Sequence, residues 1–348
     1  MTKIPELMKS WIKRIFLTGF WGLLALIWVV MSVFYYQGSR PASDDSRTII
    51  FEVQPGMTLK RVALELSKMG LIHSPSAFQA IAYIQDKETQ VMVGEFSLSP
   101  SMLPTEIIQR ITSGKTVPHP VTIPEGYRIT EIAALLHEQG LADPDTFIRL
   151  TQDKGLIQSL GIPTDTLEGY LFPETYHFSK FTPETKIVRK MIDTFKEQTS
   201  KTQLLQIAKE SSLSWHQIIT LASLIEKETG LDSERKMISS VFHNRLRKNM
   251  RLQTDPTVIY AIEKFDGNIR KRDLKIDSPY NTYKYKGLPP GPIASPGIKS
   301  IDAAMSPVES DRLYFVSRKN GSHYFSRTLT EHNQAVQKYQ LRRANSRR

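Results

Sequence analysis

The chain has 348 residues, 40% of them hydrophobic, and a formal net charge of +11 at neutral pH. It contains no cysteine, which excludes disulfides, thiolate nucleophiles and cysteine-bound metals. The length allows about two domains beyond a leader. The hydrophobic content is sufficient for a core without covalent cross-links.

The N-terminus predicts a membrane anchor. Residues 15–36 carry no charge and, at about 1.5 Å per residue, can cross a hydrocarbon core of about 30 Å. A cleaved signal peptide is the alternative, but the apolar run is long for one and ends in aromatic residues rather than small ones. The preceding cations predict that residues 1–14 stay in the cytoplasm, that residues 15–36 span the membrane once and that the rest of the chain is exported. These cations are Lys3, Lys9, Lys13 and Arg14.

The exported part is also basic, with clusters at 270–272 and in the C-terminal tail. A basic surface outside the cytoplasm favours an anionic polymer or lipid head groups as a partner and argues against nucleic acid. For the tail alone, a frayed and solvated end is the preferred interpretation.

A small α+β unit is predicted at 47–115, after a polar linker at 37–46 that is rich in turn formers. Its order of strand, turn and helix resembles a LysM-like module, a small fold with which cell-wall enzymes contact peptidoglycan. Any other small α+β unit could give the same pattern, so both interpretations stay open. The expected elements are a strand near Ile50–Val53, a turn at Pro55-Gly56, a helix capped by Thr58, and helices at Ser76–Ile84 and Pro104–Thr112.

Residues 116–348 predict a larger, mostly helical unit, so the whole chain is expected to be α+β. The most informative helix is expected to follow the N-cap residue Ser214, to run from Trp215 to Thr229 and to stop at Gly230. This unit is the predicted catalytic domain.

Three further signals lie in the larger unit. A short helix is expected at Leu204–Glu210, and Thr254-Asp255-Pro256 is typical of the start of another helix. Alternating apolar residues around Asn320-Gly321 predict a C-terminal β-hairpin with a type I′ turn.

The candidate catalytic residues are two glutamates at the end of a predicted helix. The sequence contains no H-E-x-x-H, phosphate loop or G-x-S-x-G motif, and neither a metal nor a cofactor is expected. Glu226 and Glu228 close the apolar helix, where the helix dipole and partial burial both raise a carboxyl pKa. Residues two apart point to different sides of a helix, so the two cannot act as a facing pair. An ordinary solvated helix end, paired with lysines such as Lys227, is the alternative.

Five motifs in order carry a specific resemblance: LASLIEKETG, VFHNRL, RLQTDPTVIY, SPYNTY and GLPPGPIASPG. Together they resemble the membrane-anchored endolytic murein transglycosylase family (YceG-like), and LEGYLFPETY and the N-terminal anchor extend the similarity. The resemblance implies a lyase that cleaves nascent peptidoglycan strands between N-acetylmuramic acid and N-acetylglucosamine. One glutamic acid would act first as acid and then as base, leaving 1,6-anhydro ends and limiting strand length. Peptidoglycan strands, and membrane-bound peptidoglycan synthases, are the implied partners.

The resemblance also suggests site residues. Glu228 is preferred over Glu226 as the catalytic acid, because in related lytic enzymes a Ser or Thr follows the catalytic glutamate and Thr229 follows Glu228. Asn244 and Arg245 are expected to orient loops, and Glu174 is a weak candidate for an auxiliary carboxylate. The predicted substrate-binding residues are Gln253, Asp255, Asn281 and Tyr283.

Structural alternatives accompany these roles. Asp255 could serve only as an N-cap, and Asn281 and Tyr283 could belong to a structural turn. Two other functions also stay open. One is a non-catalytic scaffold that binds peptidoglycan, and the other is a muramidase that uses Glu228 and Asp255 as two carboxylates.

Overall fold

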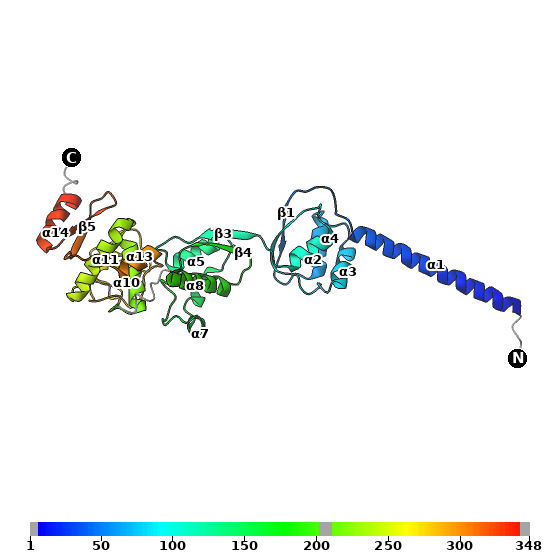
Figure 1. Cartoon of the computed structure of the whole chain (residues 1–348), viewed down its shortest axis with the longest axis horizontal. Helices are drawn as coiled ribbons and strands as arrows, with labels where there is room; N and C mark the ends of the chain where they lie inside the picture. Colours follow the sequence, from blue (N-terminus) through cyan, green and yellow to red (C-terminus); the bar gives the residue numbers. More distant parts are fainter. Residues whose placement is uncertain (1–5, 202–210, 342–348) are drawn as a thin grey trace. The chain divides into compact units, whose positions relative to one another are not determined.

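Figure 1 shows the computed structural model of the chain, which describes residues 6–201 and 211–341. The chain forms two compact units: one contains the chain up to Pro118 together with Ser179–Phe181, and the other contains His119–Phe178 and the chain from Thr182 onward. In the described residues helices dominate, and the strands form three two-stranded sheets. The mixed α+β class is therefore confirmed. The short helix predicted at Leu204–Glu210 lies outside the described residues.

The N-terminal helix α1 extends over Glu6–Gly38, so it includes the first two residues of the predicted linker. Its segment Arg14–Tyr36 has a mean hydropathy of 2.1 and is long and apolar enough to cross a membrane. The rest of the protein does not bury this segment. By length and composition this one helix fits either a membrane anchor or a signal sequence.

The first unit is built on the antiparallel pair β1 and β2, in which Phe51 lies opposite Phe96. Both phenylalanines are buried and pack against apolar residues of the surrounding helices, such as Leu66 and Phe78. The Thr58 hydroxyl accepts a hydrogen bond from the backbone of Arg61, as expected for an N-cap. The elements are β1 (Ile49–Val53), α2 (Leu59–Lys68), α3 (Pro75–Ile84), β2 (Gly94–Leu98) and α4 (Pro104–Thr112).

The start of α3 differs from the prediction. The helix begins at Pro75, and Ser74 caps it by accepting a hydrogen bond from the backbone of Ala77. Proline is favoured at the first helical position, because it has no N–H to satisfy there. The predicted start at Ser76 was wrong because it overlooked this Ser-Pro signal.

The second unit is mostly helical, as predicted. Strands β3 (Pro118–Thr122) and β4 (Thr175–Ser179) pair with each other, and β5 pairs with β6 in an antiparallel hairpin. The remaining elements are α5 (Ile129–Glu138), α6 (Pro144–Leu150), α7 (Lys154–Ser159), α8 (Glu184–Lys201), α10 (Trp215–Glu228), α11 (Asp232–Arg247), α12 (Asp255–Ala261), η1 (Asp273–Lys275), α13 (Ile298–Met305), β5 (Tyr314–Ser317), β6 (His323–Ser326), α14 (Leu329–Val336) and η2 (Gln337–Leu341).

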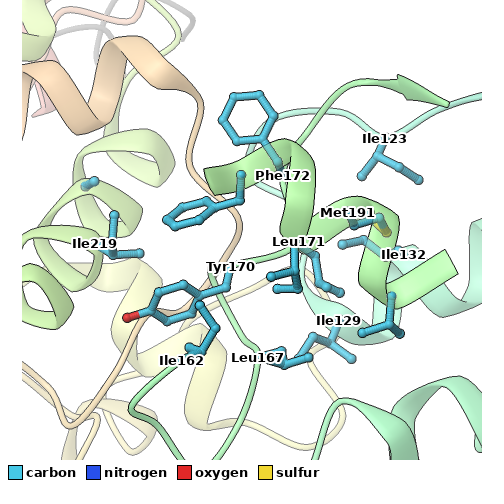
Figure 2. Packing of buried hydrophobic residues seen from close by; sticks show 14 of the residues in the cluster. Ile123, Ile129, Ile132, Ile162, Leu167, Tyr170, Leu171, Phe172, Met191 and Ile219 are labelled. Carbon is cyan, nitrogen blue, oxygen red and sulfur yellow. The ribbon is translucent and has the colours of Figure 1, made fainter. Parts of the chain in front are cut away.

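The segment 167–172 lies in the core of the second unit. Figure 2 shows Tyr170, Leu171 and Phe172 among buried residues of other elements, such as Met191 of α8 and Ile219 of α10. The LEGYLFPETY motif therefore serves chiefly to build the core on which α10 is placed.

Gly169 adopts a positive φ of 82°, and a Cβ at this position would lie 2.3 Å from the Cβ of Pro292. The backbone of the core segment therefore approaches the GLPPGPIASPG loop closely, which only glycine permits.

Glu168 is buried beside this core at the N-terminus of α5. Its carboxyl accepts hydrogen bonds from the backbone N–H of Ile129 (3.2 Å) and the hydroxyl of Tyr260 (3.4 Å). Burial outweighs these donors and raises the pKa of Glu168 to about 7. The folded protein therefore retains a proton that the unfolded chain releases near the ordinary glutamate pKa.

We expect this proton to make stability depend on pH. The contribution of Glu168 is fully present below its unfolded pKa and is lost as the pH rises through about 7. Between pH 5 and pH 8 the free energy of unfolding should fall by roughly 2–3 kcal/mol more in the parent protein than in Glu168→Gln. Chemical denaturation at the two pH values measures this. Glu138→Gln, on the exposed face of α5, is the control, and equal slopes for the parent and Glu168→Gln would contradict the prediction.

The C-terminal hairpin is confirmed, but the predicted turn type was wrong. The connection between β5 and β6 spans residues 318–322, with positive φ at Lys319 and Gly321 rather than at Asn320 and Gly321 together. A type I′ turn needs positive φ at both central residues. The Asn320 side chain instead accepts hydrogen bonds from the N–H and hydroxyl of Ser322, which favours a longer loop.

Candidate active site

Helix α10 carries both candidate glutamates to its C-terminus. Ser214 caps the helix, and a capping box with Gln217 fixes its start. Every residue of 218–225 is buried, so the apolar run holds the helix in the core. The helix ends at Glu228, and Thr229 is extended with a φ of −147°. The predicted end at Thr229–Gly230 was therefore one residue too long, and no left-handed glycine terminates the helix.

Glu228 faces the start of α12. The hydroxyl of Thr254 donates a hydrogen bond to Oε1 of Glu228. Burial raises the pKa of Glu228 to about 7, and the nearby Asp255 carboxylate raises it further, while Thr254, His323 and Arg245 act in the opposite direction. The group can therefore hold and release a proton near neutral pH.

Thr254 occupies the N-cap position of α12, but its side chain makes no capping bond to the helix. Its hydroxyl is directed at Glu228, and its backbone N–H donates to the hydroxyl of Thr282 (3.1 Å). The interpretation of Asp255 as an N-cap was wrong, because Asp255 is the first residue of the helix. The N-cap residue therefore bonds the carboxyl of Glu228 instead of the backbone of its own helix.

Asp255 and Tyr283 form a polar pair beside Glu228. The Tyr283 hydroxyl donates to Oδ1 of Asp255 at 2.6 Å, and Tyr283 is half-buried while Asp255 is exposed. Burial raises the pKa of Tyr283, so the phenol stays protonated and acts as a donor. The RLQTDP and SPYNTY motifs are therefore joined next to the candidate acid.

Gln253 is exposed and adopts a positive φ of 49°, an uncommon conformation for a residue with a side chain. Its backbone N–H donates to the carbonyl of Thr282 at 3.2 Å, which helps to hold this conformation. Gln253 therefore presents its amide side chain to solvent immediately before Thr254.

Asn281 fits the structural alternative better than a substrate contact. It is fully buried, and its amide Nδ2 donates to the carbonyl oxygens of Leu274 (3.1 Å) and Ile276 (2.8 Å). Its Oδ1 accepts from the backbone N–H of Tyr283 at 3.0 Å. The side chain shapes the loop that carries Tyr283 and has no free face for a ligand.

Glu226 points away from this site. Its Oε1 accepts from Arg235 at 3.2 Å, and its Oε2 accepts from the backbone N–H of Gly297 at 3.0 Å. Lys227 donates to the carbonyl of Gly126 at 3.1 Å, so the alternative of a solvated helix end paired with Lys227 does not describe this part of the protein. Glu226 joins α10 to α11 and to the start of α13.

Arg245 and Asn244 of α11 orient neighbouring loops, as predicted. Arg245 donates to the carbonyl oxygens of Leu313 (2.7 Å) and Leu252 (2.5 Å), and so links the C-terminal hairpin to the RLQTDP segment. Asn244 donates to the carbonyls of Ser310 and Arg312. These bonds hold the two segments that carry His323 and Thr254, both of which act on Glu228.

His323 and Glu234 also lie near the site and were not predicted as site residues. Nδ1 of His323 lies 2.7 Å from Oε2 of Glu234, and the backbone N–H of His323 donates to the same carboxylate at 2.9 Å. This pair fastens β6 to α11, and His323 is close enough to lower the pKa of Glu228. A lone histidine in a hairpin gives no sequence signal for such a contact. Glu174 is exposed and accepts from the backbone of Thr175; no described bond brings it to Glu228.

A carboxyl with a raised pKa, bonded to Thr254 and next to the exposed Asp255, is suited to acid–base chemistry on a polar substrate. The chain matches the YceG-like family over residues 51–338 and belongs to that family. It is 37% identical over 335 residues to the endolytic murein transglycosylase of Bacillus subtilis (strain 168), covering 89% of this chain and 91% of that protein.

Two further comparisons agree with this assignment. The endolytic murein transglycosylase of Streptococcus pneumoniae serotype 2 (strain D39 / NCTC 7466) is 30% identical over 326 residues, covering 84% of this chain and 59% of that protein. The crystal structure of a YceG-like protein from Listeria monocytogenes matches with a TM-score of 0.58 and 35% identity, covering 82% of this chain and 98% of that chain.

Proposed function

We propose that the protein is an endolytic murein transglycosylase, a lyase that cuts peptidoglycan glycan strands internally, with Glu228 as its acid and base. The observation that carries this assignment is the bond from Thr254 to the Glu228 carboxyl, which sets this group, with its pKa raised to about 7, at a segment whose neighbouring residues Gln253 and Asp255 are exposed. Similarity to the Bacillus subtilis enzyme over most of both chains supports the reaction class.

The reaction needs one group that first donates and then accepts a proton. Protonated Glu228 gives its proton to the oxygen that bridges N-acetylmuramic acid and N-acetylglucosamine, and the bond from that oxygen to C1 breaks. The resulting carboxylate removes the proton from the muramic 6-hydroxyl as its oxygen bonds to C1. The acid is regenerated, no water is consumed, and the new end is a 1,6-anhydro sugar.

Asp255 has an auxiliary role in this proposal. Its negative charge contributes to the raised pKa of Glu228 and favours the positive charge that develops at C1. Gln253 and Tyr283 are the proposed glycan contacts, through an amide and an aromatic face. Asn281 acts by positioning Tyr283.

The N-terminal helix supports a membrane-tethered enzyme. We assign residues 15–36 as a single span of the inner membrane, with 1–14 in the cytoplasm and the rest in the periplasm. Residues 47–115 would act as a LysM-like unit that contacts glycan, and their order of strand, two helices and strand is compatible with that role. The tether would keep the site close to nascent strands and to membrane-bound synthases.

Product analysis tests the reaction. Uncrosslinked glycan strands are incubated with the full-length protein in detergent, and the products are examined by mass spectrometry. Internal fragments with muramic ends one water lighter than hydrolysis products support the lyase. Hydrated ends would instead indicate the muramidase, and intact strands that co-sediment with the protein would indicate the scaffold.

Removing the donor to Glu228 should move the pH profile of the reaction. A hydrogen bond to the carboxylate favours its charged form, so Thr254→Val should raise the pKa of Glu228. Because Glu228 must start protonated, the decline in rate at high pH should shift to higher pH in Thr254→Val. Initial rates of strand cleavage between pH 5 and pH 9 measure the shift. Thr254→Ser keeps the hydroxyl and should leave the profile unchanged; a matching shift in that variant would contradict this explanation.

A further inference from the structure

Helix α3 ends in two large side chains, Tyr83 and Ile84, that remain exposed within the described part of the protein. Phe78 and Ala82 on its inner face are about 1% exposed, whereas Tyr83 and Ile84 are 70% and 79% exposed. The helix sequence PSAFQAIAYI has few polar residues on any side. A helix that is apolar all round is normally enclosed by protein or by lipid.

This end of α3 lies against α1, within the same compact unit. A Cβ at Gly38 would lie 2.6 Å from Cδ1 of Ile81, so the two helices approach each other closely where α1 ends. Beyond this contact they enclose an apolar groove. Its lining includes Val30, Met31 and Phe34 of α1 and Ala80, Ile81 and Ile84 of α3.

The α1 side of the groove belongs to the segment Arg14–Tyr36, which is apolar enough to cross a membrane. Val30 precedes Tyr36 by six residues, so it lies roughly 9 Å deeper along the helix axis. Amphipathic segments at membrane surfaces typically bury their apolar side about 5–10 Å into the boundary between head groups and acyl chains. The groove is therefore at the depth where lipid chains would meet Ile84.

We propose that the C-terminal end of α3, through Tyr83 and Ile84, inserts into the outer leaflet beside α1, and that lipid chains fill the groove between the two helices. The proposal rests on the membrane span assigned above. The groove is continuous with that span, so the lipid that would surround the span is its expected occupant. The consequence is a second membrane contact, which restricts how the first unit can tilt on its tether.

Depth-dependent fluorescence quenching tests this contact, and the chain has no cysteine to interfere with labelling. Full-length Ile84→Cys, labelled with an environment-sensitive fluorophore, is placed in lipid nanodiscs with nitroxide lipids whose spin label lies near the head-group boundary. We expect a blue-shifted emission that these lipids quench by about twofold or more. Leu64→Cys on α2, an exposed apolar residue outside the groove, should show neither effect.

A probe at Phe20, within the span, tests the membrane span separately from the contact of α3 with lipid. If lipids carrying a deep nitroxide quench Phe20→Cys while Ile84→Cys behaves like Leu64→Cys, the span stands and the α3 contact is overturned. A blue shift at Ile84 without lipid quenching would mean that protein covers the groove, which also overturns the proposal. Absence of quenching at Phe20 would reject the span itself, and with it the contact.

Discussion

Glu228→Gln is expected to lower the rate of glycan cleavage by about 10²–10⁴-fold, the usual contribution of a general acid–base group. Glutamine keeps the size of the side chain and can still accept the hydrogen bond from Thr254, but it cannot donate a proton to the leaving oxygen. At neutral pH the substitution also removes a carboxyl that is costly to ionise where it lies, so stability should not fall. Initial rates on uncrosslinked strands, with circular dichroism of both proteins, measure the two effects.

Two other glutamates serve as comparisons. Glu174→Gln changes an exposed residue away from the site and should leave the rate unaltered. Glu226→Gln should weaken the protein through its bond to Arg235, yet the fraction that stays folded should still cleave strands. Loss of cleavage in folded Glu226→Gln, with normal rates in Glu228→Gln, would transfer the catalytic role to Glu226.

Arg235→Met is expected to lower the free energy of unfolding by about 3–5 kcal/mol, as is typical when one partner of a buried ion pair is removed. The side chains of Arg235 and Glu226 are 5% and 6% exposed, so the carboxylate left behind could not be solvated. Arg235 also bonds to Asp232 within α11. Its bond to Ser300, at 3.0 Å, joins α11 to α13. Chemical denaturation of the full-length protein in detergent measures the loss.

Lys236 provides a matched control on the same helix. It pairs with Asp302 at 2.9 Å, but both side chains are more than 40% exposed, so Lys236→Met should cost no more than about 1 kcal/mol. Replacing both buried partners, as Glu226→Leu with Arg235→Met, should recover part of the stability lost in the single variant. Equal losses in Arg235→Met and Lys236→Met would contradict the account of this ion pair.

Local signals in the sequence predicted much of the fold. The long apolar run gave the bounds of the apolar helix closely, and α4 has the predicted limits because Pro104 marks its start. Errors occurred where a side-chain bond decided the outcome. Asn320 bonds to Ser322 instead of forming a tight turn, and Ser74 caps α3, which begins at Pro75 rather than at Ser76.

Only those features of the candidate site that lie within a single sequence motif could be predicted. The end of α10 showed two glutamates, but their different roles depend on partners distant in sequence: Thr254 for Glu228, and Arg235 with Gly297 for Glu226. The burial of Asn281 and the position of His323 beside the site likewise depend on tertiary contacts. Such contacts have no periodicity or spacing from which they could be predicted.

The most direct test of the central claim is a pH titration of the Glu228 carboxyl by infrared difference spectroscopy, comparing the protein with Glu228→Gln. Subtracting the variant removes the signals of every other carboxyl, including Glu168. We predict a protonated-carboxyl band that is present in mildly acidic solution and disappears with a midpoint near pH 7. A midpoint near the ordinary glutamate value of 4.5 would leave Glu228 ionised at neutral pH and would contradict its role as the proton donor.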